Sequence, residues 1–356
     1  MSAPEADDSV GASTQPPAAS VIVLGYNGRH YLDACFASLR DQDVPRDTYE
    51  LIYVDNASSD GSASYVEERF EDVRVVRLDR NYGYADGNNI GFRHSRGRIV
   101  VFLNQDTVVG RTWLRELLEG LQSSPDIGAA HANIIQPWYP EFAKAKERQD
   151  PGAAYTAEVS RLGYVRYKRL PPGDRPVDTL FLHGVCIAIR REIVEELDYI
   201  FDPDFFLYAE DLDLGLRLHA LGYRTVVVPR AVVCHLHTLR TRPTPATFAR
   251  TVRIIRNRFL SFYKVMPLPE FLLTVPLIAL GGPSNATEFG LSSRRQLLYG
   301  LLLVPVTIAA MFVTIWQLRL FAEKRRRVLA RRSGFRCLPE MWRSRPGTWV
   351  SAEEDS

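Results

Sequence analysis

Short apolar runs alternate with helical patterns along the first third of the chain. Val21–Leu24 is a β-branched run suited to a strand buried on both faces, and a turn and a helical spacing of apolar residues follow it. The same order recurs with strands predicted over Glu50–Val54, Val73–Leu78 and Ile99–Leu103. Strand, turn and helix repeated with short connections predict an α/β domain with a mostly parallel sheet and helices on both faces.

Polar clusters stand where these predicted strands end. Asp55 follows the second strand, and Asn104-Gln105-Asp106 closes the fourth. The glycine-rich stretch Asn81–Gly91 follows the third and is expected to be a loop that runs into a helix. Ligands of such sheets bind beyond the carboxyl ends of the strands. The clusters therefore predict a ligand site at this edge.

The pattern loosens over residues 138–175, which are polar and proline-flanked and favour an active-site loop or lid over a core element. Order returns over Leu180–Ile189. A helix is expected to start within Ala209–Asp213, and a strand is expected over Thr225–Val228. Arg250–Lys264 is a basic amphipathic stretch.

Two apolar segments near the C-terminus point to a membrane. Phe271–Leu280 is short for a span and is broken by Pro276, whereas Leu297–Leu318 is uncharged over about 22 residues, enough to cross a bilayer. A buried helix and an in-plane helix are the alternatives. Basic residues flank the pair of segments on both sides and prefer the cytoplasm, so we expect either a helical hairpin or two segments that dip in from one face.

Composition adds little to this picture except at the ends. The chain of 356 residues is 46% hydrophobic and 24% charged, as in a folded protein. Its net charge is only +2, but the tail after Gln317 is basic, which favours contact with anionic lipid. The four scattered cysteines, without a CxxC spacing, are typical of buried thiols in a reducing compartment. We expect no secretory signal and a disordered segment over residues 1–19.

Six motifs in this order resemble the family 2 glycosyltransferases of the GT-A fold, especially their rhamnosyltransferase-like bacterial branch. They are VIVLGYNG (Val21–Gly28), IYVDNASSDGS (Ile52–Ser62), NYGYADGNNIG (Asn81–Gly91), FLNQDT (Phe102–Thr107), FFLYAEDLDLGLRLHALGY (Phe205–Tyr223) and VCHLH (Val233–His237). The resemblance implies a GT-A glycosyltransferase domain over 20–240. A helical membrane-associated region over 241–332, with apolar segments 271–280 and 297–318, and a tail over 333–356 would follow it.

The resemblance assigns the nucleotide sugar to the first motifs. In the family the residue at Asp55 accepts the imide N–H of uracil or thymine, which implies a UDP- or dTDP-sugar. From the residues alone, the alternative is a turn aspartate that caps the next helix, the role we expect for Asp60. The other expected nucleotide-sugar contacts are Leu24, Tyr26, Asn27, Asn81, Gly83, Asn88, Asn104, Gln105 and His183. A structural histidine is the alternative for His183, and the glycines would let the backbone approach the ligand.

Asn104-Gln105-Asp106 occupies the place of the family's metal motif. Mg²⁺ or Mn²⁺ prefers oxygen ligands and stabilises the charge of a leaving diphosphate, so Asp106 is the expected ligand. By resemblance His235 is a second ligand, and His237 faces the same side if the preceding strand continues. The family commonly has Asp-x-Asp, so the metal or ribose contact of Asn104 stays open. The alternatives are a strand-end turn and a packed histidine.

An inverting transfer needs a carboxylate that takes the proton of the acceptor hydroxyl. The resemblance assigns this role to Asp211, with Glu210 orienting Asp211 or the acceptor. The alternative is that both carboxylates only cap a helix that starts there. Asp213 is expected to pair with Arg217, four residues on.

Together these features predict an inverting glycosyltransferase at the cytoplasmic face of the cell membrane. It would transfer a sugar such as rhamnose from a dTDP- or UDP-sugar to a lipid-linked or membrane-proximal glycan, without a nucleic-acid partner. A catalytically inactive scaffold that binds glycan or nucleotide is the alternative, and the retained Asp106, Asp211 and His235 argue against it. A processive synthase would carry Gln-x-x-Arg-Trp after the base, and a nucleotidyltransferase would carry a basic glycine-rich loop after the first strand. Neither motif occurs.

Overall fold

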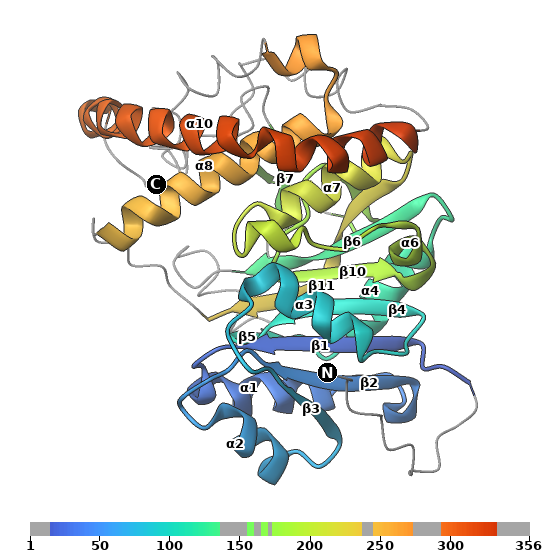
Figure 1. Cartoon of the computed structure of the whole chain (residues 1–356). Helices are drawn as coiled ribbons and strands as arrows, with labels where there is room; N and C mark the ends of the chain where they lie inside the picture. Colours follow the sequence, from blue (N-terminus) through green and yellow to red (C-terminus); the bar gives the residue numbers. More distant parts are fainter. Residues whose placement is uncertain are drawn as a thin grey trace, which may run out of the picture.

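The computed structural model describes residues 15–135, 155–159, 165–169, 173–236, 245–272 and 293–332. Its centre is a nine-stranded sheet in the order β3–β2–β1–β4–β10–β6–β11–β5, with β9 paired to β11 (Figure 1). The strands are β1 Ala19–Gly25, β2 Tyr49–Asp55, β3 Val73–Arg77, β4 Ile99–Asn104, β5 Thr107–Val109, β6 Ile127–Ile135, β9 Val177–Asp178, β10 Cys186–Arg190 and β11 Arg224–His235. The helices are α1 Arg29–Arg40, α2 Ser62–Arg69, α3 Gly83–Arg93, α4 Trp113–Gln122, α6 Arg191–Glu196, α7 Glu210–Ala220, α8 Pro245–Val265 and α10 Ser293–Ala330.

The four strands predicted in the first third all form and pair in parallel, in the order β3–β2–β1–β4. The rest of the sheet is mixed. β10 runs antiparallel between β4 and β6, whereas β11 runs parallel to β6 and antiparallel to β5. The strand predicted over Thr225–Val228 continues to His235, across a register shift between Val228 and Val232.

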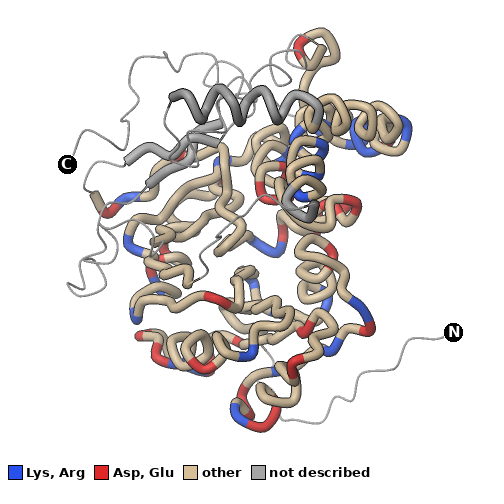
Figure 2. The backbone as a smooth tube through the Cα atoms, turned by 90° about the vertical axis from the view of Figure 1, so that its left-hand side faces the viewer, with Lys and Arg blue, Asp and Glu red and all other residues tan. Residues whose placement is uncertain are grey.

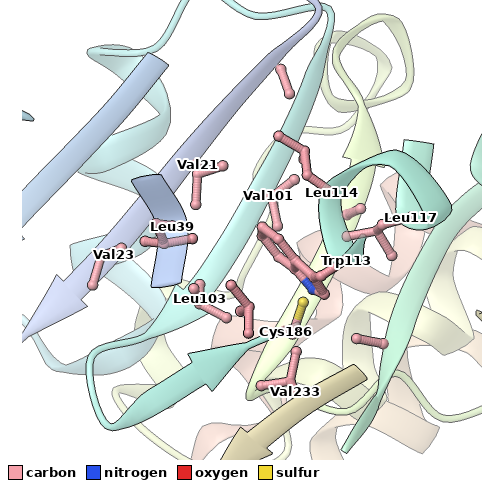
Figure 3. Close-up of a cluster of buried hydrophobic side chains, with 14 of the residues drawn as sticks. Val21, Val23, Leu39, Val101, Leu103, Trp113, Leu114, Leu117, Cys186 and Val233 are labelled. Carbon is pink, nitrogen blue, oxygen red and sulfur yellow. The ribbon is translucent and has the colours of Figure 1, made fainter. Parts of the chain in front are cut away.

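Each strand at the centre of the sheet is buried on both faces, as the apolar runs predict. On β1, Val21 and Val23 belong to a core formed with α1 and α4, whereas Ile22 belongs to a second core formed with α3 and α7. Figure 3 shows the first core around the buried indole of Trp113, with Cys186 beside it. The sheet is thus the middle layer of three.

The glycine-rich third motif is a helix from Gly83 onward, so the expected loop is limited to Asn81 and Tyr82, and the helix expected after it begins earlier than predicted. α3 begins at Gly83, and later glycines face β1. A Cβ atom on Gly87 would lie 2.8 Å from Leu24 Cδ1, and one on Gly91 would lie 2.7 Å from Ile22 Cγ2. These glycines let the helix pack closely on the strand, and their sequence signature is the same as that of a ligand-binding loop.

The helices beyond residue 240 share a core with α7. Leu214 and Leu218 of α7 face the sheet, whereas Leu212 and Leu216 belong to a cluster that includes Phe259 of α8 and the inner side of α10. α10 crosses α8 at the top of Figure 1. The basic amphipathic stretch predicted over 250–264 therefore lies within the packed body of the protein.

Part of the segment 138–175, expected as a loop, forms two short strands. β7 Tyr155–Val159 pairs antiparallel with β8 Val165–Arg169. The remainder of that segment up to residue 172 lies outside the described residues. The same holds for residues 1–14, His237, most of the apolar segment 271–280 and the tail from residue 333.

Candidate functional site

Asp55 lies at the carboxyl edge of the sheet with one oxygen available. It ends β2, in register with Gly25 of β1. The residue is 4% exposed, and its Oδ2 accepts a hydrogen bond from the Ser58 N–H at 3.1 Å, while Oδ1 has no partner among the described residues. A buried carboxylate oxygen without a donor is costly, so this position fits a donor N–H that a ligand supplies.

Asp60 takes the capping role that was expected of it. Its Oδ1 accepts a hydrogen bond from the Ser62 N–H at 3.1 Å, at the start of α2. Its Oδ2 accepts one from the Arg29 N–H at 3.0 Å, at the start of α1. The capping role predicted for Asp60 is therefore confirmed, whereas Asp55 keeps one oxygen off the helix ends and its contact with a nucleotide stays a prediction.

The turn after β1 is held by two predicted site residues. Asn27 has a φ of 50°, and its Oδ1 accepts a hydrogen bond from the Ser59 N–H at 2.8 Å. Gln105 Nε2 donates to the Tyr26 carbonyl at 3.1 Å, and a Cβ atom on Gly28 would lie 2.2 Å from that nitrogen. The amide of Gln105 thus lies over the turn and joins the ends of β1 and β4.

Leu24 and Asn104 are paired in register near the ends of β1 and β4. The main chain of Asn104 is fully used, because its N–H donates to the Val185 carbonyl at 3.0 Å and its carbonyl accepts from Thr107 Oγ1 at 2.7 Å. Its side chain is half-buried at the same edge as Asp55. The structure therefore brings these two predicted residues to the ligand edge.

Asn56 holds the start of α3, and the sequence reasoning missed it. Its Nδ2 donates to Asn81 Oδ1 at 3.1 Å and to the Gly83 carbonyl at 3.0 Å, and its Oδ1 accepts from the Tyr82 N–H at 2.8 Å. Its position directly after the strand-ending Asp55 was the available signal. Asn81 and Gly83 are thus fixed at the edge where Asp55 lies.

Asn88 is placed differently from the other predicted contacts. It is 1% exposed inside α3, and its Nδ2 donates to the Tyr84 carbonyl at 3.0 Å. The hydroxyl of Tyr84 in turn donates to the Gly184 carbonyl. The observed bonds give Asn88 a role within the helix, and it is Tyr84, which was not predicted, that reaches the other half of the site.

Asp106 and His235 lie side by side because of one strand pairing. His235 ends β11 opposite Thr107 of β5, and the Leu236 N–H donates to the Asp106 carbonyl at 2.8 Å. Asp106 Oδ2 lies 3.2 Å from His235 Nε2, and each side chain is 15% exposed. The structure therefore brings together the two residues expected to hold a metal.

This pair fits a divalent cation. Two atoms that bind an octahedral ion side by side at about 2.1 Å lie about 3 Å apart, close to the separation of Asp106 Oδ2 and His235 Nε2. Within the described ranges no group of three or more His, Cys, Asp or Glu residues gathers as an ion site. Mg²⁺ commonly takes one or two protein ligands together with substrate phosphates. Two protein ligands are therefore enough for an ion that also binds a diphosphate.

Asp211 stands at the start of α7 and accepts two backbone hydrogen bonds. The Gly184 N–H donates to Oδ2 at 3.0 Å, and the Leu212 N–H donates to Oδ1 at 2.8 Å. Burial raises the pKa of Asp211 to about 6, although these N–H donors and the charge of Arg258 act in the opposite direction. A carboxylate with this pKa is ionised at neutral pH and is a suitable general base.

Glu210, the residue before Asp211, is a buried carboxyl group with a strongly raised pKa. It is 5% exposed, and its Oε2 has no hydrogen-bond partner in the part of the chain that the structure describes. Burial, followed by the negative charge of Asp211, raises the pKa of Glu210 well above its usual range. The two neighbouring carboxyl groups therefore titrate as a pair in which Glu210 loses its proton at a higher pH than Asp211.

His183 lies on the segment that contacts the base. Burial lowers the pKa of His183 to about 3, and the charges of His131 and His235 act in the same direction. The next residue, Gly184, donates to Asp211. His183 is thus a neutral imidazole on a segment that donates to Asp211 through the Gly184 N–H and accepts a hydrogen bond from the Asn104 N–H through the Val185 carbonyl.

The fold and the site together define a GT-A-like α/β protein, with an aspartate–histidine pair and a Glu–Asp pair beside one sheet edge. The family model for glycosyl transferase family 2 matches residues 20–198. The chain therefore belongs to glycosyl transferase family 2, as its motifs indicate.

Curated relatives and a solved structure agree with this assignment. The N-acetylglucosaminyl-diphospho-decaprenol L-rhamnosyltransferase of Mycobacterium tuberculosis is 27% identical over 248 residues, which cover 64% of this chain and 78% of that one. The O-antigen biosynthesis protein RfbC of Myxococcus xanthus is 30% identical over 203 residues, which cover 52% of this chain but 15% of that protein. The mannosyltransferase PcManGT from Pyrobaculum calidifontis, solved with GDP-Man and Mn²⁺, is 21% identical with a TM-score of 0.53, over 88% of this chain and 91% of that one. It has the same fold.

Proposed function

We propose that the protein is an inverting glycosyltransferase that moves a sugar from a dTDP- or UDP-sugar to a lipid-linked or membrane-proximal glycan. One observation carries the proposal. Asp211, a carboxyl group with a pKa raised to about 6, accepts a hydrogen bond from the Gly184 N–H, and the carbonyl of the next residue, Val185, accepts one from the N–H of Asn104, two residues before Asp106. A base for an acceptor hydroxyl and a site for a diphosphate therefore adjoin.

The donor's nucleotide lies along the ends of β1 and β2 in this proposal. Asp55 Oδ1, buried and without a partner among the described residues, accepts the imide N–H of uracil or thymine. The turn that Asn27 and Gln105 hold supports the ribose side. The named activity of the mycobacterial relative, a rhamnosyl transfer to a lipid diphosphate sugar, supports rhamnose as the sugar and a lipid-linked acceptor.

The chemistry is a single displacement. Asp106 and His235 would hold Mg²⁺ or Mn²⁺, and the ion would supply positive charge to stabilise the leaving diphosphate. Asp211 takes the proton of the acceptor hydroxyl while that oxygen attacks the anomeric carbon from the face opposite the diphosphate. The bond from carbon to diphosphate oxygen breaks, its electron pair leaves with the diphosphate, and the anomeric centre is inverted. Glu210, kept protonated by burial, leaves the negative charge on Asp211.

The test is metal-dependent release of nucleoside diphosphate from a panel of UDP-, dTDP- and GDP-sugars, by the full chain in detergent. We expect one UDP- or dTDP-sugar to be hydrolysed slowly with Mg²⁺ or Mn²⁺, and this activity to vanish with EDTA. Transfer to a polyprenyl-diphosphate sugar then identifies the acceptor class. If no donor binds or turns over, the protein is better described as a scaffold.

We further propose that α10 lies on the cytoplasmic surface of the membrane. Val306–Ala330 is 25 residues long and, by length and composition, apolar enough to cross a bilayer. One side of α10 packs on α8, and on that side Lys324 is paired with Asp202, just before the 3₁₀ turn Pro203–Phe205, at 2.5 Å. The opposite side exposes large apolar residues: Ile308, Phe312, Val313, Ile315, Trp316 and Leu320. Basic positions follow along α10 and appear in blue in the upper part of Figure 2. An apolar face beside cations suits an in-plane helix on anionic lipid.

Flotation with vesicles that contain phosphatidylglycerol tests this placement. Phe312→Ser combined with Trp316→Ser is expected to lower the bound fraction several-fold, since each exposed aromatic ring contributes buried area at the interface. Thr314→Ala, on the buried side of α10, is the matched control. Equal binding of both variants would rule out this face as the contact surface.

A further inference from the structure

The segment before the base is strained. We call Phe205–Ala209 the strap, because it joins the end of a short 3₁₀ turn to the first residue of α7. Phe206, Tyr208 and Ala209 have φ values of 63°, 75° and 63°. Residues other than glycine rarely adopt this region of backbone space, and they persist there only where the surroundings hold them. Asp211 follows the strap by two residues.

One side chain of α8 donates hydrogen bonds to the backbone of the strap. Asn257 is fully buried, and its Nδ2 lies 3.2, 3.1 and 2.6 Å from the carbonyl oxygens of Phe205, Leu207 and Tyr208. Three strap carbonyls thus converge on a single amide nitrogen.

The amide of Asn257 is oriented by its neighbour. Arg256 Nη1 donates to Asn257 Oδ1 at 2.8 Å, so the NH₂ group faces the strap. Arg256 also donates to the Asp204 carbonyl at 3.0 Å and to Gln317 Oε1 of α10 at 2.5 Å. The hydrogen bonds that support the strap therefore connect α8 with α10.

The other side of the strap contacts the start of α3. The Phe206 carbonyl accepts hydrogen bonds from the Tyr84 N–H at 2.7 Å and the Ala85 N–H at 3.2 Å. A Cβ atom on Gly83 would lie 2.2 Å from the same carbonyl oxygen. The strap thus lies between the start of α3 and α7, the helix that carries Asp211.

We propose that Asn257 is a positioning residue for the transfer reaction. By holding the strap in its positive-φ conformation it sets where α7 begins, and so where the carboxylate of Asp211 lies. The inference rests on the proposed function in assigning Asp211 as the base. Without the amide, the three carbonyls lose their donor and the strap relaxes toward ordinary backbone angles. A shift of the base by about 1 Å is enough to slow the chemical step about 100-fold.

The test compares Asn257→Asp with Ser261→Ala in the full chain. Asn257→Asp keeps the shape but removes both donor hydrogens. Ser261 lies one turn further along α8, is buried, and donates only to the Asn257 carbonyl at 2.9 Å. Ser261→Ala therefore removes one buried hydrogen bond without touching the strap. Asn257→Ser, which keeps one donor, serves if Asn257→Asp does not fold.

Three measurements follow. In Asn257→Asp or Asn257→Ser, amide hydrogen exchange is expected to accelerate in peptides that cover the strap. For Asn257→Asp, kcat is expected to fall about 100-fold, whereas the donor KM is expected to stay nearly constant. Ser261→Ala should change none of these. Equal exchange and equal kcat in the Asn257 and Ser261 variants would overturn the inference. An inactive wild type would overturn the proposed function instead, and the exchange comparison would still decide whether Asn257 holds the strap.

Discussion

Nε2 of His235 lies 3.2 Å from Oδ2 of Asp106, across the pairing between β5 and β11. The two residues are far apart in the sequence, so no local sequence pattern places them together. β11 runs parallel to β6 for most of its length, shifts register after Val228, and only its last residues pair with β5. The length of β11 therefore places its last residue, His235, at the edge of the sheet where Asp106 lies.

The Asp106–His235 pair predicts how activity depends on metal. Asp106→Ala is expected to abolish donor hydrolysis, and His235→Ala to raise the Mn²⁺ concentration for half-maximal rate about 10- to 100-fold, since one ligand of two is lost. Metal titration of the rate measures both. Asp41→Ala and His30→Ala, at exposed positions, are the controls. An unchanged metal requirement in both variants would contradict the assignment.

The pKa of Asp211 predicts an acidic limb in the rate profile. A base must be deprotonated, so kcat is expected to fall about tenfold per pH unit below pH 6, from the pKa of about 6, and Asp211→Asn is expected to lower kcat about 10²- to 10⁴-fold. The charge of Arg258 lowers the pKa of this carboxyl, so Arg258→Ala should move the limb to higher pH. Arg319→Ala, exposed on α10, should leave it in place. A limb that moves to lower pH in Arg258→Ala would contradict the assignment of Asp211 as the base.

The oxygen of Asp55 that has no partner among the described residues predicts selectivity for the nucleobase. Asp55→Ala removes an acceptor for a nucleobase N–H, and a hydrogen bond to a charged group is worth about 1.5–3 kcal/mol, or about 10- to 100-fold in donor affinity. The donor KM should rise by this factor with little change in kcat, because the contact is the same in ground and transition states. Isothermal titration with UDP and CDP gives the selectivity directly. Glu68→Ala, exposed on α2, is the control, and unaltered UDP binding in Asp55→Ala would refute the contact.

A buried network of charges joins α7, α8 and α10. Lys264 is fully buried, with its Nζ 2.7 Å from Asp202 Oδ2 and 2.5 Å from Asp213 Oδ1. Asp213 also pairs with Arg217 at 2.8 Å, as its spacing predicts, and Lys324 pairs with Asp202 at 2.5 Å. Each of these four side chains, Lys264, Asp202, Asp213 and Arg217, has a partner of opposite sign.

Removal of Lys264 is expected to destabilise the whole chain. Lys264→Met leaves two buried carboxylates without their shared partner, and breaking a buried ion pair on one side costs about 3–5 kcal/mol. The free energy of unfolding from urea denaturation measures the change. Arg326→Met, at a side chain that is 77% exposed, should stay within about 0.5 kcal/mol of the wild type. A loss for Lys264→Met as small as that of the control would show that the network is not stabilising as a unit.

The same network predicts sensitivity to acid. Burial alone would raise the pKa of Asp202, but Lys264 and Lys324 more than offset it and hold the pKa below its usual value of 3.8. A depressed pKa stabilises the fold above the unfolded value, and this contribution is lost as the pH falls below about 4. The difference in unfolding free energy between wild type and Asp202→Asn should therefore shrink between pH 5 and pH 3. A difference that stays constant over this interval would contradict the depressed pKa.

Local patterns were enough to predict the strands of the parallel half and the polar residues at their ends. The β-branched runs around Val21 and Ile52 are buried on both faces, because such runs are stable only between two helical layers. The helix start at Glu210 and the capping role of Asp60 were also predicted, since both depend on neighbours within a few residues. The glycines of α3 were misread, because a glycine that admits a ligand and one that admits a strand look alike in a sequence.

What the sequence by itself determined was the type of each local element and the residue types available for chemistry at the strand ends. Only the tertiary structure decided which of them meet. The pairing of β11 with β5 sets His235 beside Asp106, and burial between α7 and the segment at Gly184 raises the pKa of Asp211. The hold of Asn257 on the strap has no local signature at all, because it joins a strained turn to a helix about fifty residues later in the chain. Contacts of this kind depend on chain packing, which no local spacing records.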